Sequence, residues 1–144
     1  MNPRNNLALG PTITRIGLGM VLLAHSLWLK AVVFTLPGTA AFFESIGLPG
    51  FMAYIVFAVE AIAGVALVLG IGTRLAAAAA VPVLLGALWA HSGAGWLFTN
   101  AGGGWEYPAF LAVIAVAQVF LGPGAFALSN ATVGRRVSMP QTQS

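Results

Sequence analysis

The chain has no cysteine, and this absence excludes several kinds of chemistry. Without thiols there is no disulfide framework, no thiol redox relay, no thiolate-held iron–sulfur cluster and no heme held by thiolate. If this protein takes part in electron transfer, the electrons must therefore come from a bound cofactor or from a partner chain.

Charge is also scarce, because only 6% of the 144 residues are charged. A soluble domain carries about a quarter charged residues. With 59% hydrophobic residues and a mean hydropathy of +0.93, the polar surface is too small to coat a water-soluble globule. The sequence therefore predicts an integral membrane protein. The net charge is +3, and the longest run of basic residues is Arg135-Arg136. Basic residues this few and scattered indicate membrane topology and not nucleic-acid binding.

Long apolar stretches make up most of the chain, each of about the length that crosses a bilayer. They predict an all-α, four-helix transmembrane bundle with spans at residues 11–34, 51–69, 75–91 and 106–121. The first stretch resembles a signal peptide in outline, but no small-residue cleavage site follows it, so we expect a retained span. Residues 1–128 then form a single membrane domain, and residues 129–144 form a polar tail that we expect to be disordered and cytoplasmic.

Two connections refine this picture. Thr35-Leu36-Pro37-Gly38 is predicted to end the first helix, and residues 39–50 to form a short amphipathic segment at the membrane interface. The turn at residues 70–74 is short, so the second and third spans should be antiparallel neighbours. Small residues in these spans, Ala76 to Ala80 among them, allow helices to approach closely in lipid.

The basic residues predict the orientation. With four spans, Arg4, Arg74, Arg135 and Arg136 fall on one side, and Lys30 is the one basic residue near the other. The positive-inside rule then places both termini in the cytoplasm of a multi-pass protein of the cell inner membrane. An aromatic belt is expected at the opposite interface, formed by Trp28, Trp89, Trp96, Trp105 and Tyr107.

Ionisable residues inside the spans are the candidates for function, because each costs about 2.5–3.5 kcal/mol to insert at a span centre. They are Arg15, His25, Lys30, Glu60 and His91. At ~1.5 Å of rise per residue, Glu60 lies near mid-membrane, and the others except Arg15 lie in the outer half.

The functional hypothesis is a polar pocket open to the extracytoplasmic side. In it Glu60 accepts a hydrogen bond or a proton that His25 relays, both side chains face inward, and Trp28 or Trp89 stacks on a bound ring. The structural alternative is that Glu60 pairs with Arg15 or His25 and locks the first span against the second.

Metal and heme sites are weaker alternatives. His25 and His91 lie at comparable depth on different spans, which is the arrangement of bis-histidine heme ligation. Together with Glu60 they also have the ligand types of a metal site, but no pair of histidines four residues apart supports one. We assign no metal site and favour a quinone over heme as cofactor.

The order of these residues resembles the DoxX family of small four-span membrane proteins, over roughly residues 14–128. The resemblance rests on Arg15 to Gly19 with His25 and Lys30, on Phe43 to Pro49, on Glu60 with Gly64, on Gly70 to Ala77, on His91 and on Gly122 to Ala125. The chain departs from common members at Ser26, where a glycine usually follows the histidine.

The resemblance implies a fold more firmly than a function. The family name comes from a subunit linked to quinone-coupled sulfur oxidation, and other members are associated with membrane redox complexes or oxidative-stress responses. The polar positions that match are Arg15, His25, Lys30, Glu60 and His91, and the family has no established catalytic set to transfer onto them.

Three functions follow from these observations. The first is a subunit associated with a quinone-linked membrane redox system, as an accessory subunit of an oxidoreductase. The second is a non-catalytic assembly subunit that packs against other membrane subunits or against copies of itself. The third is a small-solute or proton transporter, for which four spans are few unless the protein oligomerises.

Overall fold

A computed structural model describes residues 3–129, with side chains from residue 8 onward, and no strand occurs in this part of the chain. The helices are α1 (Pro3–Leu23), η1 (Ala24–Val33), α2 (Leu36–Ser45), α3 (Phe51–Leu69), α4 (Thr73–His91), η2 (Ser92–Ala94) and α5 (Glu106–Leu121). The all-α prediction is confirmed, and the second and fourth predicted spans coincide with α3 and α5. Most of the predicted polar tail lies outside the described residues.

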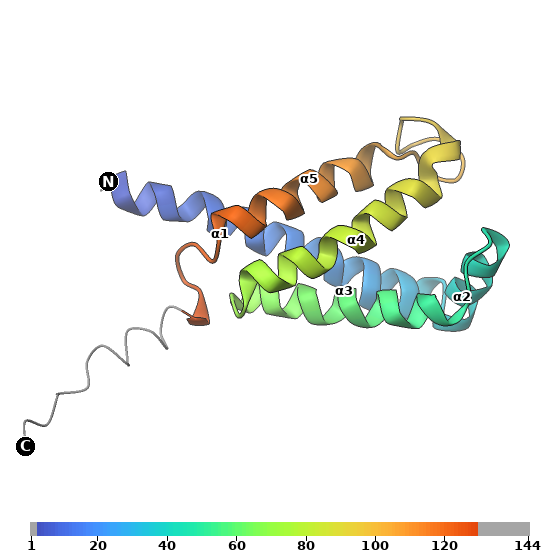
Figure 1. The fold of residues 1–144 in the computed structure, drawn as a ribbon, viewed down its shortest axis with the longest axis horizontal. Coiled ribbons are helices and arrows are strands. Elements are labelled where there is room, and N and C mark those ends of the chain that lie inside the picture. Colours follow the sequence, from blue (N-terminus) through green and yellow to red (C-terminus); the bar gives the residue numbers. More distant parts are fainter. Residues whose placement is uncertain (1–2, 130–144) are drawn as a thin grey trace, which may run out of the picture.

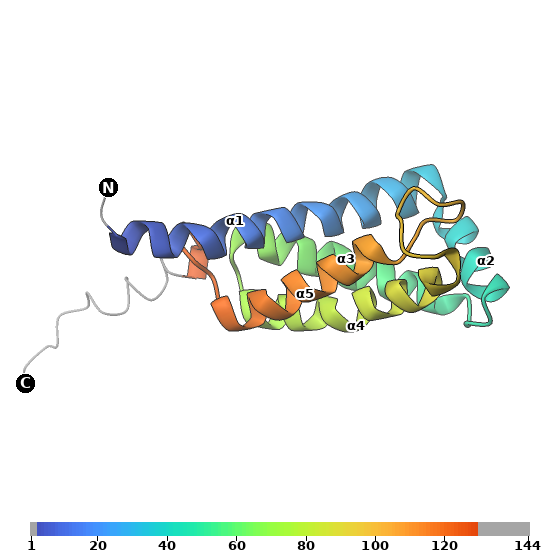
Figure 2. The ribbon, with the colours of Figure 1, turned by 90° about the horizontal axis from the view of Figure 1, so that it is seen from above.

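The long helices run alternately up and down in an elongated bundle (Figures 1 and 2). At one end lie α2 and the connection of residues 92–105, which we call the loop end. At the other lie the start of α1, the turn of residues 70–72 and residues 122–129, which we call the turn end. The described chain therefore begins and ends at the same end of the bundle.

The bundle has large apolar side chains on its outside and small ones inside. Ile62, Leu75 and Phe120 are at least 70% exposed, whereas Ala63, Ala77 and others of the core are buried. Within residues 3–129, three segments are long and apolar enough to cross a membrane: Ala8–Val33, Phe51–Leu69 and Thr73–Ala94. Helix α5 is apolar but shorter, because 16 residues span ~24 Å against a hydrocarbon core of ~30 Å.

Helices α1 and α3 meet through two glycines. A Cβ atom on Gly19 would lie 2.9 Å from the carbonyl oxygen of Gly64, and one on Gly64 would lie 3.0 Å from that of Gly19. The two backbones are therefore in contact, which only residues without a side chain allow. This contact brings the polar residues of the first helix close to α3.

The connection after the first helix is shorter than predicted. The first helix ends at Val33, just before residues 35–38 as expected, and only Phe34 and Thr35 lie between η1 and α2. Thr35 has a φ of 62°, and its hydroxyl accepts a hydrogen bond from the Gly38 amide at 3.2 Å. Pro37 lies in the first turn of α2, where its missing N–H costs nothing. The segment predicted at residues 39–50 therefore begins three residues earlier, at Leu36, because a threonine cap and a proline favour the start of a helix.

The last third of the first long helix is wound as a π-helix. Segment η1 continues α1 without a break, and its last turn is closed by a hydrogen bond from the Phe34 amide to the Leu29 carbonyl at 2.8 Å. Bonds between residues five apart bring such residues onto one face. In an α-helix, residues five apart would point about 140° away from each other.

Candidate functional site

A buried ion pair joins η1 to α3. The Lys30 Nζ atom lies 2.6 Å from the Glu60 Oε2 atom, and the two side chains are 16% and 7% exposed. Glu60 thus faces the interior, as expected, but its partner is Lys30. Two charges removed from water persist only when each is closely paired.

His25 lies beside this ion pair, five residues before Lys30 on the π-helical face. Its Nδ1 atom is 2.9 Å from the Val21 carbonyl oxygen. A carbonyl can only accept, so Nδ1 carries a hydrogen, and Nε2 has a free lone pair whenever the ring is neutral. The imidazole lies within electrostatic range of the Glu60 carboxylate.

A tyrosine from α5 completes the arrangement. The Tyr107 ring stacks on His25 with centroids 5.9 Å apart and planes 25° apart. The sequence placed Tyr107 in the aromatic belt and gave no sign of this contact, because the contact depends on how α5 packs. We call His25, Lys30, Glu60 and Tyr107 the ion-pair cluster. It holds a cation, a carboxylate, a free imidazole nitrogen and an aromatic ring.

Arg15 does not pair with Glu60, so that part of the structural alternative was wrong. Its Nη1 atom donates to the carbonyl oxygens of Leu67 at 2.6 Å and Val68 at 3.0 Å, and the residue is 1% exposed. Leu67 is seven residues beyond Glu60, or ~10 Å along α3. The guanidinium is held at the C-terminus of α3, where free carbonyls and the helix dipole attract a cation.

The remaining candidates lie away from the cluster's contacts. The His91 Nδ1 atom donates to the Gly102 carbonyl at 2.9 Å and so ties the 92–105 connection to α4. Trp28 and Trp89 are more than half exposed. Within residues 3–129, no three side chains of the His, Cys, Asp or Glu types come together as a metal site, so the hypothesis of His25, His91 and Glu60 around one ion is not supported.

Gln118 is a buried polar residue that the sequence reading missed. It is fully buried in α5, accepts a hydrogen bond from the Thr14 hydroxyl at 2.7 Å and donates to the Gly122 carbonyl at 2.6 Å. As the one amide within an otherwise apolar helix, it could have been recognised as an inward-facing group. It joins α1 to α5 near the turn end, far along the helix from Tyr107.

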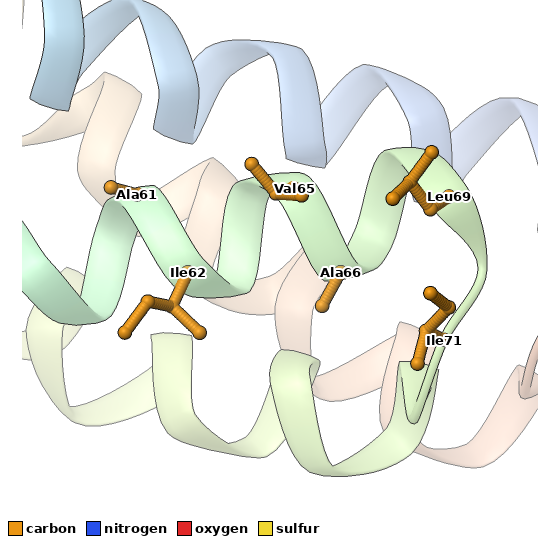
Figure 3. A pocket seen from close by; sticks show the side chains of 6 residues that line it. All are labelled: Ala61, Ile62, Val65, Ala66, Leu69 and Ile71. Atoms are coloured by element: carbon orange, nitrogen blue, oxygen red, sulfur yellow. The ribbon is translucent and has the colours of Figure 1, made fainter.

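Two hollows on the surface beside α3 are apolar. A groove of about 410 Å³ runs along the outside of α3 (Figure 3). Its lining residues are Ala61, Ile62, Val65, Ala66, Leu69 and Ile71. No donor or acceptor side chain lines it, so it suits lipid chains and carries no chemistry of its own.

Comparison with known proteins identifies the family. A family model described as DoxX matches residues 10–93, which is more than half of the chain. The chain belongs to the DoxX family. The matched region contains Arg15, His25, Lys30, Glu60 and His91, whereas Tyr107 and Gln118 lie beyond it. The family and the apolar helices together make this a multi-pass membrane protein with lipid around its helices.

A curated relative points in the same direction. The Bacillus subtilis (strain 168) protein named "Putative oxidoreductase CatD" is 36% identical over 80 residues. The match covers 56% of this chain and 58% of the relative, so the similarity spans little more than half of either protein. No solved structure matches the chain.

Proposed function

We propose that this DoxX protein is a subunit of a quinone-linked membrane redox system, and that the ion-pair cluster handles the quinone headgroup. The observation that carries the proposal is the Lys30–Glu60 pair, buried between two apolar helices. Charges inside a membrane helix are costly and usually mark functional sites. The oxidoreductase name of the Bacillus subtilis relative supports a redox role.

The side chains of the cluster match what a quinone needs. A quinone has two carbonyl oxygens that accept hydrogen bonds, and the Lys30 ammonium is a strong donor. When a quinone is reduced it takes up two electrons and two protons. The free Nε2 atom of His25 can accept a proton and pass it on, and Glu60 offsets the positive charge of Lys30 and of a protonated His25. The Tyr107 ring offers a surface on which a flat headgroup stacks.

The electrons must come from elsewhere in the complex. The chain has no cysteine to hold an iron–sulfur cluster, so a bound cofactor or a partner chain supplies them. The protein would then be an accessory subunit that binds the quinone and supplies protons, and the bound cofactor or the partner chain would carry the electrons.

We further propose four spans with both termini in the cytoplasm of the inner membrane. Both ends of the described chain lie at the same end of the bundle, which supports an even number of membrane crossings (Figure 1). Helix α5 is short, and its neighbours Trp105 and residues 125–128 extend its apolar length. The turn end, with Arg74, then faces the cytoplasm, and the ion-pair cluster is reached from the outer half.

Quinone extraction from the gently solubilised protein tests the proposal. Wild-type protein, purified with its partners, should carry quinone in near-stoichiometric amount. Lys30→Met and Glu60→Gln should each lose most of it. Glu44→Gln removes a carboxylate from an exposed position on α2, so it is the matched control and should keep its bound quinone. A wild-type preparation free of quinone, or equal loss in the control, would overturn the proposal.

A non-catalytic assembly subunit is the second candidate, and one surface favours it. Helix α4 exposes small residues four apart, Ala78, Pro82 and Gly86, and a Cβ on Gly86 would touch nothing within 4 Å. Such a face suits close packing of a partner helix or of a second copy. If this function holds, Gly86→Leu should release a stoichiometric partner while Glu60→Gln leaves the complex intact.

A further inference from the structure

The turn end has positive charge and no acidic side chain of its own. The three acidic residues of the whole chain are Glu44 in α2, Glu60 in the middle of α3 and Glu106 at the start of α5. None belongs to the turn end, where Arg15 and Arg74 lie. Arg15 is buried and bonded only to neutral carbonyls. No carboxylate side chain at the turn end therefore balances these two cations.

The first turn of α4 is open to an acceptor. Gly72 at the N-cap offers no side-chain cap, and the first turn contains no acidic residue. The first helical hydrogen bond here runs from the Ala76 amide to the Gly72 carbonyl at 3.0 Å. The amides of Thr73, Arg74 and Leu75 precede it, and such amides with the helix dipole attract anions. Gly72, Arg74 and Leu75 are exposed, so a ligand can approach from outside.

Two buried polar atoms around the same turn lack partners. They are the Arg15 Nε atom and the Thr73 Oγ1 atom, in residues that are 1% and 3% exposed. Thr73 is the first residue of α4, and the Arg15 Nη1 atom lies 2.6 Å from where a Cβ on Gly70 would be. Buried donors without acceptors are rare in native proteins. Both atoms can donate, and the Thr73 hydroxyl, in the first turn of α4, is the one that an acceptor at this helix start would satisfy.

We propose that the turn end binds a phosphate group. Its oxygens would accept from the amides of the first turn of α4, from the Thr73 hydroxyl and from the Arg74 guanidinium. The charge of Arg15 lies behind the turn and strengthens the binding without leaving the α3 carbonyls. A phospholipid headgroup and inorganic phosphate share this chemistry. The site is independent of the ion-pair cluster, which lies on the other half of the bundle.

The structural alternative concerns Arg74. Its guanidinium lies over the end of α5, with Nε 3.3 Å from where a Cβ on Gly122 would be. There it interacts with the C-terminal dipole of α5 whether or not a ligand binds. The Thr73 hydroxyl distinguishes the two readings, because it has no hydrogen-bond partner in the structure and only the phosphate reading gives it one.

The test compares two probes on the full chain in neutral detergent. Native mass spectrometry counts bound dioleoylphosphatidylglycerol, and the thermal midpoint is compared in inorganic phosphate and in chloride at equal ionic strength. The variants are Thr73→Val and Arg74→Gln, with Thr73→Ser as the version that keeps the hydroxyl. Arg135→Gln removes the same charge from the tail and controls for general attraction.

Thr73→Val and Arg74→Gln should each weaken binding about tenfold, as the loss of one charge-assisted hydrogen bond does. Thr73→Ser and Arg135→Gln should bind as the wild type. Binding of the lipid alone assigns the site to a headgroup, and a midpoint raised by inorganic phosphate assigns it to the free anion. If neither probe binds, or if Arg135→Gln loses as much as Arg74→Gln, the proposal is wrong.

Discussion

At the scale of single residues, the account depends on which cation faces which acceptor. Two cations on the first long helix reach α3 in different ways. Lys30 pairs with a carboxylate, and Arg15 binds the backbone carbonyls at the end of the helix. The lysine contact joins two formal charges, whereas the arginine contact holds the end of α3 in place. The two residues therefore differ in what their removal should do.

Removing one partner of the ion pair should destabilise the protein strongly. Lys30→Met leaves Glu60 buried and unpaired, so we expect a loss of about 3–5 kcal/mol in the free energy of unfolding. Lys30→Met combined with Glu60→Leu removes both charges and should recover most of that loss. Unfolding in detergent, followed for both single variants and the pair, measures the coupling. If the double variant is as unstable as the sum of the single ones, the pair does not exist as described.

Only part of the ion-pair cluster could be predicted from the sequence. It singled out His25, Lys30 and Glu60, because ionisable groups inside apolar helices are few and conspicuous. It did not find that Lys30 is the partner of Glu60. On an α-helical wheel His25 and Lys30 point in different directions, so no helical periodicity unites them. Tyr107 was missed for another reason, since its contact with His25 depends on the packing of α5.

At the scale of elements, the π-helical winding of η1 brings His25 and Lys30 of the ion-pair cluster onto one face. Helix bounds were largely predictable, because apolar runs end at glycines such as Gly70 and Gly122, both of which have a positive φ. The change from α to π winding was not predictable, since it leaves the composition of the segment unaltered. At the start of the segment, the hydroxyl of the buried Ser26 donates to the Leu22 carbonyl at 2.9 Å.

Inserting one residue into η1 should separate Lys30 from Glu60. An alanine inserted after the exposed Leu27 places Lys30 six residues after His25, and this spacing no longer matches the five-residue repeat of the π-helix, so Lys30 turns away from α3. Because the chain has no cysteine, a Lys30→Cys and Glu60→Cys pair gives a clean readout with a short bismaleimide, which spans more than a disulfide does. We expect efficient cross-linking in the pair without the insertion and little in the pair with it.

A matched insertion is the control for this test. An alanine inserted after Val33, at the C-terminal end of η1, lengthens the helix without shifting Lys30 relative to α1. That insertion should leave cross-linking intact. Equal cross-linking with both insertions would show that the winding of η1 does not position Lys30.

At the scale of the whole molecule, the charges are divided between the two ends of the bundle. All acidic residues lie in the half toward the loop end or at mid-helix, and Arg74 lies at the turn end. This division supports one orientation in the membrane and gives each half a distinct role. The half with the ion-pair cluster would bind the quinone, and the turn end would bind phosphate.

Labelling of single introduced cysteines should report the orientation. Ala101→Cys, exposed at the loop end, should react with a membrane-impermeant maleimide in intact cells. Ile71→Cys, exposed at the turn end, should react only after permeabilisation. The positive-inside rule sets this expectation. The reverse pattern would place both described chain ends outside the cytoplasm and would contradict the proposed topology.

The central claim is that the ion-pair cluster receives a quinone headgroup, and photoaffinity labelling tests it most directly. The complex in native-like membranes would be irradiated with a photoreactive quinone, and the labelled residues would be mapped by mass spectrometry. The account predicts labels on peptides with His25 and Tyr107, competed away by unlabelled quinone and lost in Lys30→Met. Labelling confined to the apolar groove of α3, or unchanged in Lys30→Met, would contradict it.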